Sequence, residues 1–241
     1  MSAVSVSPTG RPRKRAVIEA LRGGLVISCQ APEGSPLRHP SHMAAMAEAA
    51  ELAGAVGIRA DGPAFVAAIR QRVAIPIIGI DKRPDIDPVA YITPSFASVE
   101  ALVAAGADLV AVDATLRPRT GENVPTAAEL IRLVREAFAD LPIMADVSSV
   151  AEGVAAAAAG ADLVATTLSG YTNGAPPPNG PDVELVAGLV AAQARPVVAE
   201  GRYGTPEQVK AAFAVGAHAV VVGTAITDTF ALAKRFIAGV R

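Results

Sequence analysis

The sequence predicts a single closed (β/α)₈ barrel, because its length, a repeated glycine pattern and its apolar strands all fit that fold. The chain has 241 residues, the usual size of one such domain. Gly54, Gly106, Gly160 and Gly216 each end a helical pattern just before an apolar strand, at intervals of 52, 54 and 56 residues. Each glycine suits the left-handed position that closes a helix. The repeat therefore indicates a supersecondary unit used several times.

A second series of apolar strands lies between the strands that follow these glycines. It comprises residues 25–30, 75–82, 141–148 and 195–202. Its strands do not alternate apolar and polar residues, as expected of parallel strands covered on both faces. Two interleaved series of four give eight strands. Since no G-x-G-x-x-G motif follows any of them, a closed barrel is favoured over an open dinucleotide-binding sheet.

Helical patterns occupy the gaps between the strands. We expect helices over residues 43–53, 63–72, 98–105, 127–139, 150–159, 182–193, 206–215 and 228–237. One start signal is especially clear, since Thr205 can cap a helix that opens with Pro206 and Glu207. A short helix over 16–22 is predicted to close the bottom of a single barrel domain, residues 16–241. The basic residues 1–15 are predicted to form a disordered tail.

The composition excludes several classes of partner and cofactor. Apolar residues make up 51% of the chain and charged residues 18%, which allows a large core. A net charge of −2 and an aromatic content of 4% give no basis for nucleic-acid or membrane binding. Without an 18-residue apolar run or a signal peptide, we expect a cytoplasmic protein. The single cysteine, Cys29, is interpreted as a buried inert thiol, and no metal site is predicted from the three histidines.

Polar side chains end the second series of strands. Gln30, Lys82, Asp146 and Glu200 close strands 1, 3, 5 and 7. Alternate strands supply one layer of side chains in a barrel, and the active site lies at the C-terminal face. Strands 3 and 7 are opposite each other, so we expect Lys82 and Glu200 to face one another across the mouth. Such a pair can remove a proton from one face of a carbon and return one to the other.

The loops after strands 7 and 8 are the usual phosphate cradle of such barrels. Arg202, Gly223 and Thr224 lie there and are predicted to bind a phosphate group. Simpler roles also exist at this face. Glu200 could merely hold Arg202, and Asp146 could cap the helix that follows it.

Two further residues at this face have alternative interpretations. Lys82 could be a rim lysine that pairs with Asp81 or Asp85. Arg59, at the end of strand 2, could bind the substrate or pair with Asp61.

Two segments outside the strand ends also suggest roles. Residues 169–182 form a Pro- and Gly-rich loop that is too long for a mere connection, so we interpret it as a lid over the site. The apolar final helix, residues 229–240, could pack against a second copy of the chain, which would make a homodimer.

Taken together, the motifs resemble those of the N-acetylmannosamine-6-phosphate 2-epimerases over roughly residues 24–238. The segments that carry the resemblance are SCQAP (28–32), GIRADG (57–62), PIIGIDKR (76–83), YITPS (91–95), DATLRPR (113–119), ADVSS (145–149), TTLSGYT (166–172), AEGRYGTPEQ (199–208) and VGTAIT (222–227). TTLSGYT and the lysine-bearing strand are the most discriminating of these, since the phosphate motif occurs in many barrels.

The resemblance implies a TIM barrel of the ribulose-phosphate-binding type and a cofactor-independent epimerase that needs no metal. Such an enzyme interconverts N-acetylmannosamine 6-phosphate and N-acetylglucosamine 6-phosphate in sialic acid catabolism. It implies that Lys82 and Glu200 are catalytic. The implied substrate-binding residues are Gln30, Arg59, Asp146, Ser169 and Tyr171.

Two positions depart from the family pattern. Asp81 stands where the family usually has an aliphatic residue, and its carboxylate is expected to raise the pKa of Lys82. Asp228 stands where the family commonly has arginine. Phosphate binding is then left to Arg202 and to backbone N–H groups after strand 8.

The expected chemistry is proton transfer at C2 of the open-chain sugar, which is α to the C1 aldehyde. Lys82 can act as a base only if burial or a cation such as Arg83 or Arg59 lowers its pKa. Three alternatives stay open from the residues alone. They are a Schiff-base aldolase that uses Lys82, another sugar-phosphate isomerase of this barrel class, and a non-catalytic sugar-phosphate binding protein.

Overall fold

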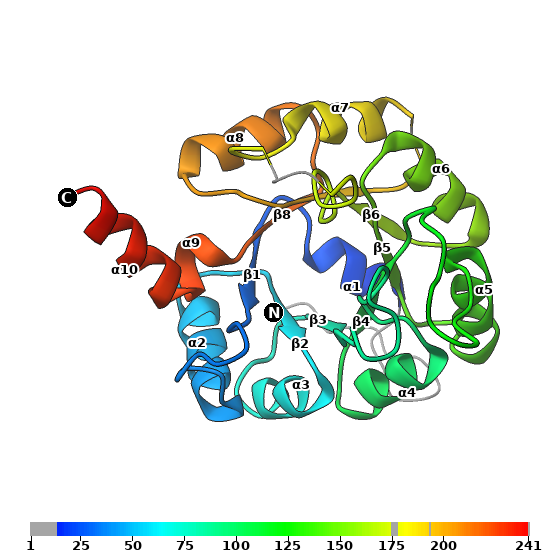
Figure 1. The fold of residues 1–241 in the computed structure, drawn as a ribbon, viewed down its shortest axis with the longest axis horizontal. Helices are drawn as coiled ribbons and strands as arrows, with labels where there is room; N and C mark the ends of the chain where they lie inside the picture. Colours follow the sequence, from blue (N-terminus) through cyan, green and yellow to red (C-terminus); the bar gives the residue numbers. More distant parts are fainter. Residues whose placement is uncertain (1–13, 175–177, 193, 241) are drawn as a thin grey trace.

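Eight parallel strands close into a barrel in the computed structural model, which describes residues 14–174, 178–192 and 194–240 (Figure 1). Each strand pairs with its neighbours in chain order, and β1 pairs with β8. The predicted fold class is therefore confirmed. The strands are β1 (Leu25–Cys29), β2 (Gly57–Asp61), β3 (Ile77–Ile80), β4 (Leu109–Asp113), β5 (Ile143–Asp146), β6 (Leu163–Ala165), β7 (Val197–Glu200) and β8 (Ala219–Val222).

Helices follow the strands and form the outer ring of the barrel, except that the first helix precedes β1 (Figure 1). They are α1 (Lys14–Ala20), α2 (Pro40–Leu52), α3 (Pro63–Arg70), α4 (Phe96–Ala104), α5 (Ala127–Ala137), α6 (Val150–Ala159), α7 (Val183–Ala191), α8 (Pro206–Ala214), α9 (Thr224–Thr227) and α10 (Thr229–Ala238). Helix α10 does not lie along the ring but projects from it between α8 and α2 (Figure 1).

Side-chain caps explain where several helices begin. The hydroxyl of Thr126 accepts a hydrogen bond from the backbone of Glu129, whose carboxylate returns one to the cap, so α5 opens with a capping box. Thr205 caps α8, as expected from the sequence. Helix α2 begins earlier than predicted because His39 accepts from the backbone N–H of Ser41 and proline occupies the first turn.

The start of the chain requires one correction. Helix α1 begins at Lys14, so Lys14 and Arg15 are helical and do not belong to the predicted tail, whose other residues, 1–13, lie outside the described part. Val17 and Leu21 are buried against the residues inside the barrel, and a ring nitrogen of His218 lies 2.8 Å from the carbonyl oxygen of Ile18. Helix α1 thus closes the N-terminal end of the barrel, as predicted.

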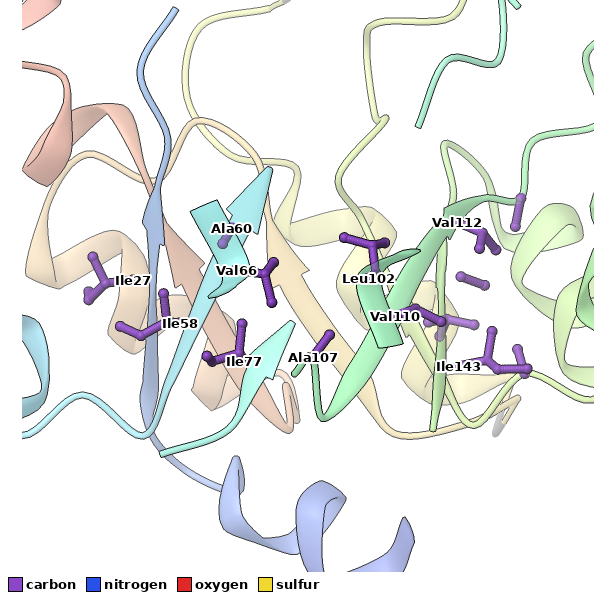
Figure 2. Packing of buried hydrophobic residues seen from close by; sticks show 14 of the residues in the cluster. Ile27, Ile58, Ala60, Val66, Ile77, Leu102, Ala107, Val110, Val112 and Ile143 are labelled. Atoms are coloured by element: carbon purple, nitrogen blue, oxygen red, sulfur yellow. The ribbon is translucent and has the colours of Figure 1, made fainter. Parts of the chain in front are cut away.

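The core has two layers that are separated by the strands. Inside the barrel lies an inner core that includes Val26, Ile78, Ile80, Leu109 and Val198. The opposite strand faces carry residues such as Ile58, Ile77 and Val110, which pack with Val66 and Leu102 from the helices (Figure 2). This two-sided burial explains why the strand sequences are continuously apolar.

The repeated glycines have the backbone conformation expected of them. Gly54, Gly106, Gly160 and Gly216 have φ angles of 95°, 100°, 113° and 99°. Residues with a Cβ atom rarely adopt this region. Each glycine ends a helix and returns the chain to the N-terminal end of the next strand. All eight strands therefore point toward the same face.

Candidate active site

A cavity of about 360 Å³ opens at the C-terminal face of the barrel. This volume lies within the range of small-molecule sites. Its walls combine polar residues from the strand ends with apolar ones such as Ile80, Tyr91 and Val221. Both Lys82 and Glu200 line it, as the positions of their strands predicted. Among the described residues, no group of three or more His, Cys, Asp or Glu side chains could hold a metal ion.

The amine of Lys82 is held between two strands that precede its own. Its Nζ donates to Gln30 Oε1 at 2.5 Å, and the amide nitrogen of Gln30 donates in turn to the hydroxyl of Ser28 at 2.7 Å. The backbone N–H of Lys82 donates to Asp61 Oδ1 at 3.0 Å, and Nζ lies 3.9 Å from Asp61 Oδ2. Lys82 is therefore fixed at both its backbone and its amine.

Burial lowers the pKa of Lys82 below its ordinary value, although 38% of its side chain still faces the cavity. Asp61 raises this pKa and Arg59 lowers it. Of the two cations expected to lower the pKa, Arg59 acts, whereas Arg83 forms an ion pair with Asp85 at 2.7 Å.

The carboxylate near the amine of Lys82 is that of Asp61, and not that of Asp81 as expected. Asp81 is out of phase with the inward-facing Ile80 and Lys82, and its carboxylate lies 3.9 Å from Arg83. The carboxylate that forms the ion pair with Lys82 is that of Asp61, on the neighbouring strand. Lys82 is accordingly a cavity lysine and not the rim lysine of the simpler interpretation.

Arg59 joins two carboxylates beneath the cavity. Its Nη2 lies 2.6 Å from Asp146 Oδ2 and its Nη1 lies 2.9 Å from Glu200 Oε2. The arginine side chain is only 1% exposed, and that of Asp146 is fully buried. Asp146 also accepts from the hydroxyl of Thr167 at 2.7 Å. Arg59 thus pairs with these two acids and not with Asp61.

The shared arginine leaves Glu200 incompletely compensated. Burial raises the pKa of Glu200 well above its ordinary value, Arg59 opposes this effect and Asp146 adds to it. The pKa of Arg59 is raised, because the charges of Asp146 and Glu200 outweigh the effect of burial. Arg59 Nε is buried and lacks a hydrogen-bond partner among the described residues. The arrangement raises the pKa of Glu200 to about 7 next to a permanently charged arginine.

The structure places the predicted sugar-binding residues in two groups. Gln30, Arg59 and Tyr171 line the cavity. Asp146 has its oxygens on Arg59 and Thr167, while Ser149, and not Asp146, caps α6. The buried hydroxyl of Ser169 donates to Asp182 Oδ2 at 2.5 Å.

Arg202 lies where the predicted phosphate cradle and the long loop meet. Its guanidinium donates to the carbonyl oxygens of Ser169 and Gly180, each at 2.6 Å, and lies over the ring of Tyr171 at 5.4 Å. Arg202 is therefore held by carbonyl oxygens of the loop and not by Glu200. Residues 175–177 of the predicted lid lie outside the described part of the chain.

Gly223, Thr224 and Asp228 line the same cavity as Arg202. A Cβ atom on Gly223 would lie 3.2 Å from the Cβ atom of Ser28, so a larger residue would push β1 and the α9 segment apart. Asp228 Oδ1 accepts from the backbone N–H of Ala231 at 2.9 Å and caps α10. One carboxylate therefore stands among the residues predicted to bind phosphate.

Sequence reasoning missed the roles of Ser28, Asp61 and Thr167, which hold the predicted site residues in place. The signal that could have found them is strand parity. Ser28 and Asp61 lie two residues from Gln30 and Arg59 and share their inward face. Thr167 is in phase with the inward-facing Ala165 of β6.

Comparison with known proteins gives a consistent result. A family model described as "Putative N-acetylmannosamine-6-phosphate epimerase" matches residues 43–241. Relatives named as putative N-acetylmannosamine-6-phosphate 2-epimerases occur in Caldanaerobacter subterraneus and Cutibacterium acnes. The first is 45% identical, with 92% of each chain covered, and the second is 50% identical, with 88% of this chain and 91% of the relative covered.

A solved structure agrees with these matches. The N-acetylmannosamine-6-phosphate 2-epimerase from Clostridium perfringens superimposes with a TM-score of 0.85 at 38% sequence identity. The alignment covers 92% of this chain and 95% of the solved one. The likeness therefore extends over the whole barrel and not only over its phosphate motif.

The buried ion-pair network predicts a large effect on stability when its cation is removed. Arg59→Met should lower the free energy of unfolding by about 3–5 kcal/mol, because Asp146 would stay buried without a counter-charge. Urea unfolding at neutral pH measures this. As a control, Arg72→Met removes an ion pair from a side chain that is 51% exposed and should change little. Equal urea midpoints for Arg59→Met and the wild type would contradict the network.

Proposed function

The chain belongs to the N-acetylmannosamine-6-phosphate epimerase family, and on this premise we propose that it inverts C2 of N-acetylmannosamine 6-phosphate with Lys82 and Glu200 as its acid–base pair. The product is N-acetylglucosamine 6-phosphate, so the enzyme is an isomerase of amino-sugar metabolism. The observation that carries the assignment of the pair is that β3 and β7, opposite strands of one barrel, deliver both residues to one cavity.

The reaction begins at the C2–H bond of the open-chain sugar. This bond is acidic because the electrons it releases are delocalised onto the neighbouring C1 aldehyde oxygen as an enolate. One group removes the proton, and the other delivers a proton to the opposite face of C2. The C2–H bond that breaks is replaced by a new C2–H bond, so no oxidant, reductant or cofactor is consumed. Acid–base groups in such positions contribute about 10²–10⁴-fold to a rate.

The electrostatics of the pair support this assignment. Burial lowers the pKa of Lys82 and raises that of Glu200. Both shifts are in the direction that helps the amine to accept a proton and the acid to donate one. The reverse reaction uses the same pair with the roles exchanged. The pair therefore supplies one proton in each direction of the reaction, from one residue in the forward reaction and from the other in the reverse reaction.

Some of the substrate-binding residues are proposed to contact the sugar directly, and others to act through neighbouring side chains. Gln30, Arg59 and Tyr171 line the cavity and are proposed to contact the sugar. Asp146 and Ser169 would act through their neighbours, since Asp146 bonds Arg59 and Thr167 and the hydroxyl of Ser169 bonds Asp182.

The phosphate is proposed to lie against Arg202, Gly223 and Thr224. Arg202 offers a permanent charge, and the chain after β8 offers backbone N–H groups. Binding the phosphate away from C2 would use remote interactions to fix the reacting carbon between Lys82 and Glu200. Asp228 lies beside this site, and its carboxylate repels a phosphate dianion.

Other reactions are less well supported. A Schiff-base aldolase would also use Lys82, but the family model and the relatives all carry the epimerase name. The proposed ligand is the sugar phosphate, and no nucleic acid or membrane is proposed as a partner. In the described residues, helices long and apolar enough to cross a bilayer are absent. We place the reaction in the cytoplasm because a charged sugar phosphate does not cross membranes unaided.

A homodimer is proposed from the exposed face of α10. None of its residues is buried, and Phe230 and Phe236 are 57% and 70% exposed. Large exposed apolar residues of this kind can mark an interaction site. Helix α10 projects away from the barrel, where a second copy can reach it (Figure 1).

Removing either member of the acid–base pair should abolish most turnover. We expect Lys82→Met and Glu200→Gln each to lower kcat by about 10²–10⁴-fold, as followed by proton NMR of the two sugar phosphates. The exposed-lysine control Lys210→Met should retain normal turnover. Near-normal rates in both Lys82→Met and Glu200→Gln would show that the mechanism is wrong.

The phosphate site should respond in opposite directions to two substitutions. Arg202→Ala should raise KM for the 6-phosphate about ten- to a hundredfold, as expected when a charge-assisted hydrogen bond is lost. Asp228→Asn should lower that KM several-fold, because asparagine still caps α10 but carries no charge. Kinetics with unphosphorylated N-acetylmannosamine are the control. If Asp228→Asn changed both substrates equally, Asp228 would not act on the phosphate.

The dimer should depend on the exposed face of α10. We expect Phe236→Asp to give a monomer and Leu133→Asp, on the exposed face of α5, to leave the dimer intact. Sedimentation velocity separates the two species. A wild-type protein that sediments as a monomer at all concentrations would contradict the proposal.

A further inference from the structure

Asp61 contacts Lys82 at two points although the two residues lie on different strands. Asp61 is the last residue of β2 and is paired in register with Ile80 of β3. Its Oδ1 accepts the backbone N–H of Lys82 at 3.0 Å, and its Oδ2 lies 3.9 Å from Lys82 Nζ. One buried carboxylate therefore touches both the main chain and the amine of the proposed catalytic lysine.

Resting on the proposed function, we infer that Asp61 is a positioning residue of the reaction: one oxygen fixes the backbone of Lys82, and the other favours the protonated amine. The first contact aims the lysine side chain into the cavity from the end of β3. The second contact lets the amine hold a proton that it takes from, or returns to, the substrate. Neither contact requires Asp61 to touch the sugar.

The charges around Lys82 explain why such a partner is needed. Arg59 on β2 and Arg38 after β1 both disfavour a charged amine, and so does burial. Glu200 on β7 favours it only while ionised, and Glu200 is the group proposed to carry a proton itself. The carboxylate of Asp61, in contrast, is not proposed to carry a proton in the reaction, and it lies 3.9 Å from the amine.

The alternation of β2 makes this arrangement available. Arg59 and Asp61 are two residues apart, so both point into the barrel. Arg59 lies against Glu200, whereas Asp61 lies against Lys82. A single strand thereby supplies the counter-charge for both members of the acid–base pair. Asp81, adjacent to Lys82 in the chain, cannot substitute because its carboxylate lies by Arg83.

Two substitutions separate the two contacts. Asp61→Asn keeps an oxygen that can accept the backbone N–H of Lys82 but removes the charge. Asp61→Ala removes both. Asp85→Asn is the control, because it removes an equal charge from the exposed ion pair with Arg83, close to Lys82 in the chain.

The direct test is the pH dependence of acylation of Lys82 by acetic anhydride, quantified by mass spectrometry of the Lys82 peptide. A carboxylate that favours the ammonium raises the pKa of the lysine, so its removal lowers it. We expect Asp61→Asn to move the labelling midpoint down by about 1 pH unit, a tenfold change in the fraction of neutral amine. Asp85→Asn should leave the midpoint in place. An unchanged midpoint in Asp61→Asn would overturn the inference.

Activity provides a second readout. The acid limb of the kcat profile should move to lower pH in Asp61→Asn, in the same direction as the labelling midpoint. Asp61→Ala should lose at least tenfold more kcat than Asp61→Asn, because the backbone contact is lost as well. Equal kcat values for the two variants would remove the positioning role.

The labelling result distinguishes this inference from the proposed function. If the wild type epimerises its substrate but Asp61→Asn does not move the midpoint, the inference fails and the function stands. If the midpoint moves but the wild type does not act on the sugar phosphate, the contact between Asp61 and Lys82 stands. In that case the reaction assigned to it is wrong.

Discussion

The buried guanidinium of Arg59 is the interaction on which the rest of the site depends. A charge removed from water must be compensated by partners with good geometry, and Arg59 has two, Asp146 and Glu200. Both carboxylate oxygens of Asp146 accept hydrogen bonds from Arg59, and one of them also accepts from the hydroxyl of Thr167. Glu200 receives only one contact from the arginine and still reaches the cavity. The pKa of Glu200 is accordingly raised by its burial, because the arginine only partly offsets that effect.

The barrel makes this sharing possible by bringing together strands that are distant in the sequence. Arg59, Asp146 and Glu200 come from β2, β5 and β7, and closure of the sheet points all three inward. The inner core beneath them is apolar, so the charges cannot be satisfied by water from below. Lys82 approaches from β3 with Asp61 and Gln30 beside it. The cavity therefore has an acid and a base on opposite walls, each with its own counter-charge or hydrogen-bond partner.

Much of this arrangement could be predicted from the sequence, because it depends on local patterns. The glycine spacing predicted the repeated units, and continuous apolar strands predicted burial on both faces. Counting strands placed Lys82 and Glu200 at the same mouth, and the structure brings both to one cavity. These inferences need only the strand period and the order of strands in a closed barrel.

The errors concern contacts between side chains of different strands. Whether Arg59 reaches Asp146 or Glu200 depends on the stagger between strands, which sequence spacing does not reveal. For the same reason the sequence pointed to Asp81, the neighbour of Lys82 in the chain, while the carboxylate near its amine is that of Asp61 on the adjacent strand. The early start of α2 was missed because a histidine served as its cap.

The central claim is that a proton leaves C2 and a different proton is delivered to its opposite face. The most direct measurement is NMR of N-acetylmannosamine 6-phosphate incubated with the wild-type enzyme in heavy water. The account predicts that the N-acetylglucosamine 6-phosphate formed carries deuterium from the solvent at C2. Product that retained its original C2 hydrogen in every molecule would contradict it.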